Sequence, residues 1–264
     1  MLDNDGMDNL LPMGGWKAMN FRVLSYGCSC ILLSLLMVLG HAYSDEIRDK
    51  KVIVSGIENE QTHAMAREVL QEAYRRIGYD VHFKFFPGRR SLELANQGQT
   101  DGDIARIWGT EKVFPNLVTV PTPIIYFQAV AFTKSVNRKI NSWHDLAGLK
   151  VGVIRGIRYS RIETEGLNPF FAEKMTHLFR LLDHDRIQIA VAALNAGKIE
   201  IHKNFKNSGI HVAGTPLYSA PLYHFINKKN EHLMDDLNQT LKDMAGQGEI
   251  AKILDDAFRN LMNE

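Results

Sequence analysis

Cysteine is almost absent from this chain of 264 residues. The two cysteines, Cys28 and Cys30, both lie in a hydrophobic stretch near the N-terminus, and no other occurs. Beyond that stretch the chain therefore has no disulfide, no cysteine metal ligand and no thiol nucleophile.

An excess of charge of one sign is also lacking. The chain has 31 Lys and Arg against 30 Asp and Glu, a formal net charge of +1. This balance gives no electrostatic reason to expect a nucleic-acid partner. The sequence contains no H-E-x-x-H, G-x-S-x-G or phosphate-binding G-x-x-x-x-G-K motif, and its ten histidines are scattered. We therefore expect no metal site and no cofactor.

A hydrophobic segment near the N-terminus is typical of an export signal. Arg22 precedes the uncharged run Cys28–Leu39, which is shorter than the roughly 20 residues that a membrane-spanning helix needs. Small residues then follow at the positions that a signal peptidase reads. We expect cleavage after Ala42 or Ser44, with Met19 as an alternative start. An uncleaved membrane anchor is the alternative interpretation.

Patterns of strand and helix alternate from residue 51 onward. The predicted strands are 51–55, 81–86 and 101–107, with helices at 65–77 and 90–96 between them. This order predicts a parallel sheet with helices on its faces.

The α/β pattern restarts near residue 137 and then returns. The predicted elements are a strand at 126–133, a capped turn at 142–148, a strand at 150–154, a helix from about 160, a helix at 187–196, a strand at 217–227 and helices at 233–245 and 250–261. The last strand and two helices complete the unit begun near residue 50. We expect an N-terminal extension and signal peptide over 1–44, a first lobe of 45–133 with 226–264, and a second lobe of 134–225.

Several short motifs carry a family resemblance. They are Arg90–Gly98 followed by Asp101-Gly-Asp103, Pro121–Tyr126, Trp143–Val153 and Gly248–Leu254. In this order and spacing the chain resembles the bacterial extracellular solute-binding proteins, family 3, the periplasmic type that serves polar amino-acid ABC transporters. The likeness covers roughly 50–262.

The resemblance implies a fold, a location and partners. The fold would be α/β and type II periplasmic-binding-protein-like, with two α/β lobes joined by two crossing strands and the ligand between them. The protein would be periplasmic, monomeric, and a donor of its solute to an inner-membrane permease.

The candidate ligand-binding residues follow the predicted strands, because ligands of open α/β sheets bind outside the carboxyl ends of the strands. They are Glu58, Arg90, Arg106, Trp108, Tyr126, Arg155 and Arg158.

Arg106 is the first of these candidates. It lies near the end of the predicted strand 101–107, and a guanidinium matches the two oxygens of a carboxylate. In the amino-acid-binding relatives, an arginine of the first lobe clamps the ligand α-carboxylate, although it usually follows a threonine-rich loop. The alternative is a structural ion pair with Asp101 or Asp103.

The other candidates also have two interpretations. Trp108 and Tyr126 either stack on a ligand or cover the core. Arg155 and Arg158 either form a positive rim or are solvated charges on a helix. Glu58 either receives a ligand cation or caps the first helix.

One departure from the family concerns the ligand ammonium group. The relatives usually hold it with an aspartate of the second lobe, some residues after an L-x-x-G-x-x-D stretch. Leu194–Glu200 matches that stretch, and it places Asn204 or Phe205 at the aspartate position. A buried ammonium without a counter-charge is costly. A carboxylate without the amine, or a larger polar ligand, therefore fits as well as an amino acid.

The sequence thus predicts a periplasmic solute-binding protein, not an enzyme. Its ligand would be small and polar, anionic or amino-acid-like, and an ABC-type permease would receive it. Two alternatives remain. One is a periplasmic enzyme of the same fold, dehydratase-like, with Glu58 as acid and base. The other is a sensory ligand-binding module.

Overall fold

The computed structural model describes residues 50–155 and 163–264. The predicted export signal over 1–44, the expected helix start near residue 160 and Arg158 lie outside these residues. Within the described part, no helix combines the length and the apolar character that a membrane span requires.

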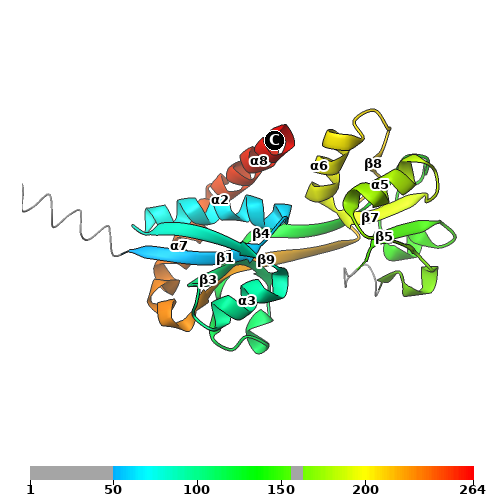
Figure 1. Cartoon of the computed structure of the whole chain (residues 1–264). Helices are drawn as coiled ribbons and strands as arrows, with labels where there is room; N and C mark the ends of the chain where they lie inside the picture. The colour runs from blue at the N-terminus through cyan, green and yellow to red at the C-terminus, as the bar shows by residue number, and fades with distance from the viewer. Residues whose placement is uncertain (1–49, 156–162) are drawn as a thin grey trace, which may run out of the picture. The chain divides into compact units, whose positions relative to one another are not determined.

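The first lobe contains a parallel sheet with helices on both faces (Figure 1). Its elements are β1 (Lys51–Ile57), α2 (Gln61–Arg76), β2 (Asp80–Phe86), α3 (Gly88–Asn96) and β3 (Gly102–Ile107). The strand order β2-β1-β3 and the parallel pairing confirm the predicted arrangement. The carboxyl ends of these three strands therefore lie along one edge of the sheet.

Two long strands connect this sheet to the second lobe. β4 (Leu117–Thr133) and β9 (Tyr218–Asn227) pair antiparallel from Leu117 opposite Asn227 to Ala129 opposite Tyr218. β9 also pairs with β3, and β4 pairs with β7, so the described residues form one continuous nine-stranded sheet. Figure 1 shows β4 and β9 running side by side. They are the two crossing strands of the expected fold.

The second lobe repeats the α/β arrangement. Its elements are β5 (Val151–Ile154), β6 (Phe170–Ala172), α5 (Met175–Asp183), β7 (Ile189–Ala193), α6 (Leu194–Asn204) and β8 (His211–Val212). β5 pairs parallel with β6 and β7, while β8 pairs with β4. Four 3-10 turns occur among the described residues, η1 (Thr110–Lys112) and η4 (Lys228–Leu233) in the first lobe and η2 (Trp143–Leu146) and η3 (Glu165–Leu167) in the second. The predicted capped turn at 142–148 is confirmed, because Ser142 and Asp145 form a capping box at η2.

The helix predicted at 187–196 is wrong. This segment contains β7, and the helix α6 begins only at Leu194. β7 is buried on both faces, with Ala190 and Ala192 in one hydrophobic cluster and Ile189 and Val191 in another. A strand buried on both faces reads as a continuous apolar run, which periodicity does not separate from a buried helix.

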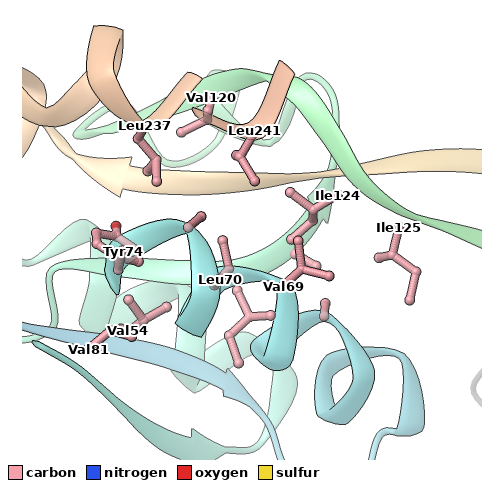
Figure 2. Close-up of a cluster of buried hydrophobic side chains, with 14 of the residues drawn as sticks. Val54, Val69, Leu70, Tyr74, Val81, Val120, Ile124, Ile125, Leu237 and Leu241 are labelled. Atoms are coloured by element: carbon pink, nitrogen blue, oxygen red, sulfur yellow. The ribbon is translucent and has the colours of Figure 1, made fainter. Parts of the chain in front are cut away.

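The hydrophobic clusters follow the division into lobes. The largest contains side chains of α2, β1, β3 and β4 together with α7 (Met234–Gly246) and α8 (Glu249–Asn263). Figure 2 shows Leu237 and Leu241 of α7 facing Val69 and Leu70 of α2. The C-terminal segment therefore completes the first lobe, as its pattern predicts. Separate clusters lie on the two faces of the second lobe.

Substitution of Gly102 tests whether β3 and β9 approach each other as closely as the structure shows. A Cβ at this position would overlap the main-chain oxygen of Phe225, which cannot move without disturbing the strand pair. Gly102→Ala should lower the free energy of unfolding by about 1–3 kcal/mol in a urea titration. Gly246, at the end of α7, is the control, since a Cβ there would meet no atom within 4 Å. Gly246→Ala should be neutral or stabilise by up to about 1 kcal/mol. A Gly102→Ala protein as stable as wild type would contradict this packing.

Candidate functional site

The carboxyl edge of the first lobe brings three of the predicted residues to one side of the sheet. Glu58 follows β1, Arg90 lies in the first turn of α3 after β2, and Arg106 lies near the end of β3. The N–H of Glu58 donates to the carbonyl oxygen of Phe86 at 3.1 Å, which holds the ends of β1 and β2 together.

A buried carboxylate lies behind this edge. The side chain of Asp103 is fully buried. Its Oδ2 accepts a hydrogen bond from Ser91 Oγ of α3 at 2.5 Å. Ser55 Oγ of β1 lies 3.5 Å from the same oxygen, but the carbonyl oxygens of Gly102 and Ser91, at 2.9 and 3.1 Å, are its closer acceptors. Arg106 donates to both carboxylate oxygens, from Nε at 2.8 Å and from Nη2 at 3.1 Å. A buried charge is tolerated only with such partners.

Arg106 is thus the ion-pair partner of Asp103, as in the structural alternative. Its Nη2 also donates to the carbonyl oxygen of Gly88 at 3.1 Å, and only 13% of its side chain is exposed. The two N–H groups on Nη1 have no hydrogen-bond partner among the described residues. The guanidinium is therefore fixed on one side and keeps two donors for an anion on the other.

A β-bulge puts Arg106 on the same face of β3 as Asp103. Residues three apart on a regular strand point to opposite faces. Here Asp103 lies opposite Phe225 and Arg106 lies opposite Tyr223, so three steps on β3 match two steps on β9. The extra residue shifts the alternation by one and turns Arg106 toward the carboxylate.

The nearby end of α3 is also suited to an anion. This nine-residue helix begins at Gly88 after Pro87, and no side chain caps it. Arg90 in its first turn is exposed, and its side chain has no hydrogen-bond or ion-pair partner in the described part of the chain. Free first-turn N–H groups add to the positive potential that Arg106 and Arg90 create.

Trp108 is exposed beside Arg106. Its side chain is 57% exposed, and its ring meets the ring of Tyr223 edge to face, with centroids 5.2 Å apart. Trp108 is therefore not a core residue. Sequence reasoning did not select Tyr223, because the alternation of 217–227 carries no sign of which partner strand lies beside it.

Tyr126 lies at a small recess between the starts of two helices. The recess is lined by Thr62, Tyr126, Phe127, Gln128, Ala193, Leu194 and Asn195, none of them charged. It is formed where α2 begins, along β4, and where β7 passes into α6. Tyr126 itself is 56% exposed. Asn195 Nδ2 lies 3.5 Å from Met65 Sδ of α2, a contact between the two lobes.

The remaining predicted residues, Arg155 and Glu58, are exposed at the surface. Arg155 is exposed and pairs with Glu173 Oε1 at 2.6 Å, with its guanidinium 5.3 Å from the centre of the Phe171 ring. Glu58 is exposed, and its side chain has no partner within 50–155 and 163–264. The idea that Glu58 caps α2 is wrong, because Glu60 is the cap and accepts from the His63 N–H at 2.8 Å.

The structure places Asn204 and Phe205, the candidates for the aspartate position, away from the carboxyl end of β7. Both lie at the far end of α6, where Asn204 donates to Glu200 Oε1 and Phe205 packs on Phe179. A short motif does not show on which turn of a helix its residues lie. The residues that follow β7 are Leu194 and Asn195, and neither is a carboxylate.

Two buried histidines support the site from within. His63 Nδ1 accepts from the Ile57 N–H at 3.1 Å, and burial lowers the His63 pKa, with a further lowering from Arg106 and an opposing effect of Asp103. His224 Nδ1 lies 2.9 Å from the Asp103 carbonyl oxygen, which can only accept, so Nδ1 carries the proton. Its Nε2 then accepts from the Tyr74 hydroxyl at 2.9 Å. Burial lowers the His224 pKa to about 4.

The described residues contain no group of three or more His, Cys, Asp or Glu side chains arranged to hold a metal ion.

Comparison with known proteins identifies relatives of this fold. The model of the bacterial extracellular solute-binding proteins, family 3, matches residues 41–260. An uncharacterized protein of Shewanella oneidensis is 26% identical over 215 residues, which cover 76% of this chain and 80% of that protein.

Solved structures share the fold at low identity. An ancestral arginine-binding protein bound to arginine superposes with a TM-score of 0.59 at 19% identity, over 79% of this chain and 98% of that one. A histidine kinase sensor domain with similarity to periplasmic binding proteins gives 0.60 at 16% identity, over 77% and 94%.

Because His224 is buried, we expect the stability of the folded protein to be sensitive to acid. Its pKa is about 4 in the folded protein and near 6.5 when unfolded, so between these values the unfolded chain binds more protons. Folding stability should therefore fall as the pH drops from 7.5 to 4, by roughly 3 kcal/mol from His224 alone. His224→Asn keeps a donor for the Asp103 carbonyl but does not titrate. Urea titrations should show a shallower pH dependence for this variant, and equal slopes for variant and wild type would contradict the assignment.

Proposed function

We propose that this chain, which belongs to the bacterial extracellular solute-binding proteins of family 3, captures a small polar solute between its two lobes. The solute is anionic or amino-acid-like, and the protein delivers it to an ABC-type permease of the inner membrane. The protein works as a monomer in the periplasm, after cleavage of its signal behind Ala42 or Ser44.

The observation that supports this proposal most directly is the hydrogen bonding of the Arg106 guanidinium. Asp103 and the Gly88 carbonyl occupy three of its five N–H groups, while Nη1 has no partner among the described residues. A guanidinium fixed in this way has lost most of its side-chain freedom before the ligand arrives. Its two free N–H groups, both on Nη1, can donate to the oxygens of an anion such as a carboxylate, while the parallel two-bond fork of Nε and Nη2 is occupied by Asp103.

Hinge closure is the second part of the proposal. The lobes are 45–133 with 226–264 and 134–225, and their hydrophobic clusters are separate. β4 and β9 join the lobes, and motion about them would close the cleft. A solute that contacts both lobes shifts the open–closed equilibrium toward the closed form, which the permease recognises.

The residues at the second lobe favour a ligand without a buried ammonium group. The recess at Tyr126 has no charged side chain, and Glu173, which follows β6, is paired with Arg155. A carboxylate without the amine fits these surroundings, since an ammonium there would lack a counter-charge. Glu58 at the edge of the first lobe is the acidic candidate for a ligand cation.

Nothing in the site favours the enzyme alternative over binding. A general acid or base needs a defined environment around the carboxyl group. Glu58, the candidate for that role, is exposed and has no side-chain partner in the described part of the chain.

The first test is a thermal-shift screen with amino acids, organic acids, polyamines and small sugars. A ligand at 100 times its dissociation constant adds about 2.7 kcal/mol of stability, which moves the melting temperature by several degrees. We expect hits among carboxylates. A response to sugars alone would contradict the proposal.

Arg106→Lys tests the anchor. Lysine keeps a positive charge beside buried Asp103, whereas alanine would leave that carboxylate unpaired. The variant should bind the carboxylate found in the screen at least tenfold more weakly by calorimetry, a loss of about 1.4 kcal/mol, because one ammonium group cannot pair with Asp103 and also supply the donors that Nη1 presents to the ligand.

Arg75→Lys is the matched control for this variant. Arg75 makes the same two-bond pair with Glu72, from Nε and Nη2, but on the exposed side of α2, where its side chain is 69% exposed. Its replacement should leave affinity within about twofold. Unchanged affinity of a folded Arg106→Lys protein would remove Arg106 from the site.

A further inference from the structure

We propose that Trp108 and Tyr223 form an aromatic wall beside Arg106, and that the site selects a carboxylate carried on an aromatic body. This inference rests on the proposed function, because Arg106 supplies the anchor for the carboxylate. It names the chemical class of the ligand, which the anchor alone leaves open.

The strand register places the three side chains on one face. Arg106 lies directly opposite Tyr223 in the antiparallel pair of β3 and β9, and opposed residues point to the same face. Trp108 follows Arg106 by two residues, so it continues on that face. The ring contact between Trp108 and Tyr223, with centroids 5.2 Å apart and planes at 76°, agrees with this placement.

Tyr223 gives the wall a rigid base. It packs against the small cluster of Ala95, Leu117 and Phe225, all buried, on the side of the sheet that α3 covers. Edge-to-face packing on a fixed ring holds the Trp108 indole in place while more than half of the side chain stays exposed. The exposed part of the indole is thus a preformed apolar surface on the same face of the sheet as Arg106.

The neighbouring surface adds apolar character. Tyr126 on β4 is exposed, and the recess beside it is uncharged. A guanidinium on the same face as an exposed indole matches a molecule with one anionic end and one apolar ring. An aliphatic acid of similar charge would leave the indole in water.

Two matched pairs of probes measure the contribution of the ring. 3-Phenylpropionate is compared with propionate, and L-phenylalanine with L-alanine, so that each pair differs only in the ring. Dissociation constants are measured by calorimetry on the purified protein. We expect the ring-bearing member of at least one pair to bind at least tenfold more tightly.

Variants assign that preference to the wall. Trp108→Ala should reduce the ring-dependent ratio at least fivefold and leave the affinity for the ringless probe nearly unchanged. Arg106→Lys should weaken both members of a pair by the same factor. Trp143→Phe is the control, because Trp143 packs against a different cluster in the second lobe, and it should change neither affinity.

Fluorescence gives an independent measurement. The chain has three tryptophans, Trp16, Trp108 and Trp143, so a variant with Trp16→Phe and Trp143→Phe has Trp108 as its single indole. The emission of this variant should change on titration with the ring-bearing probe, with the same dissociation constant as calorimetry gives.

The outcomes separate this inference from the proposed function. Equal affinity for both members of each pair, with binding that still depends on Arg106, would overturn the aromatic wall and leave the anion site intact. A ring preference that survives Trp108→Ala would also overturn it. Failure of every carboxylate to bind would overturn both.

Discussion

The buried carboxylate of Asp103 is the constraint on which the edge of the first lobe depends. A fully buried charge must be surrounded by donors, and here these donors come from α3 and β3. Satisfying the charge therefore holds the helix and the strand in one arrangement. The same carboxylate fixes the orientation of Arg106, so the stability of the lobe and the geometry of the proposed anion site have a common origin. The main-chain carbonyl of Asp103 extends the network further, through His224 to Tyr74 in the core.

The continuous sheet links this edge to the second lobe. β3 pairs with β9, and β9 pairs with β4, which continues into the second lobe and pairs there with β7. Tyr223 and Tyr126 lie on these crossing strands, so residues of the proposed site belong to the same strands that join the lobes. Ligand contact and lobe motion would thus act on one structural element.

Much of the fold could be predicted from the sequence, because local patterns and packing agree there. The strands near residues 51 and 81, the helix between them and the return of the chain to the first lobe all follow from periodicity and turn residues. β7 could not be predicted, because a strand buried on both faces has no alternation. The place of Arg106 at the end of a strand was enough to select it. The pairing of Arg106 with Asp103 instead of Asp101 depends on the bulge, and no residue type in that stretch predicts a bulge. Tyr223 and His224 depend on the neighbouring strand, so only the tertiary structure reveals their roles.

The bulge in β3 makes the length of the segment as important as its composition. Asp103 and Arg106 are three residues apart, whereas their partners on β9 are two residues apart. This extra residue decides to which face of the sheet each following side chain of β3 points. A point substitution at Arg106 or Trp108 changes the chemistry of the edge but does not change the face to which the side chain points. One further residue inserted between Asp103 and Arg106 would shift the alternation again and turn the guanidinium to the opposite face. Among descendants of this chain, substitutions can therefore diversify the ligand preference, whereas single-residue insertions within this segment would be selected against.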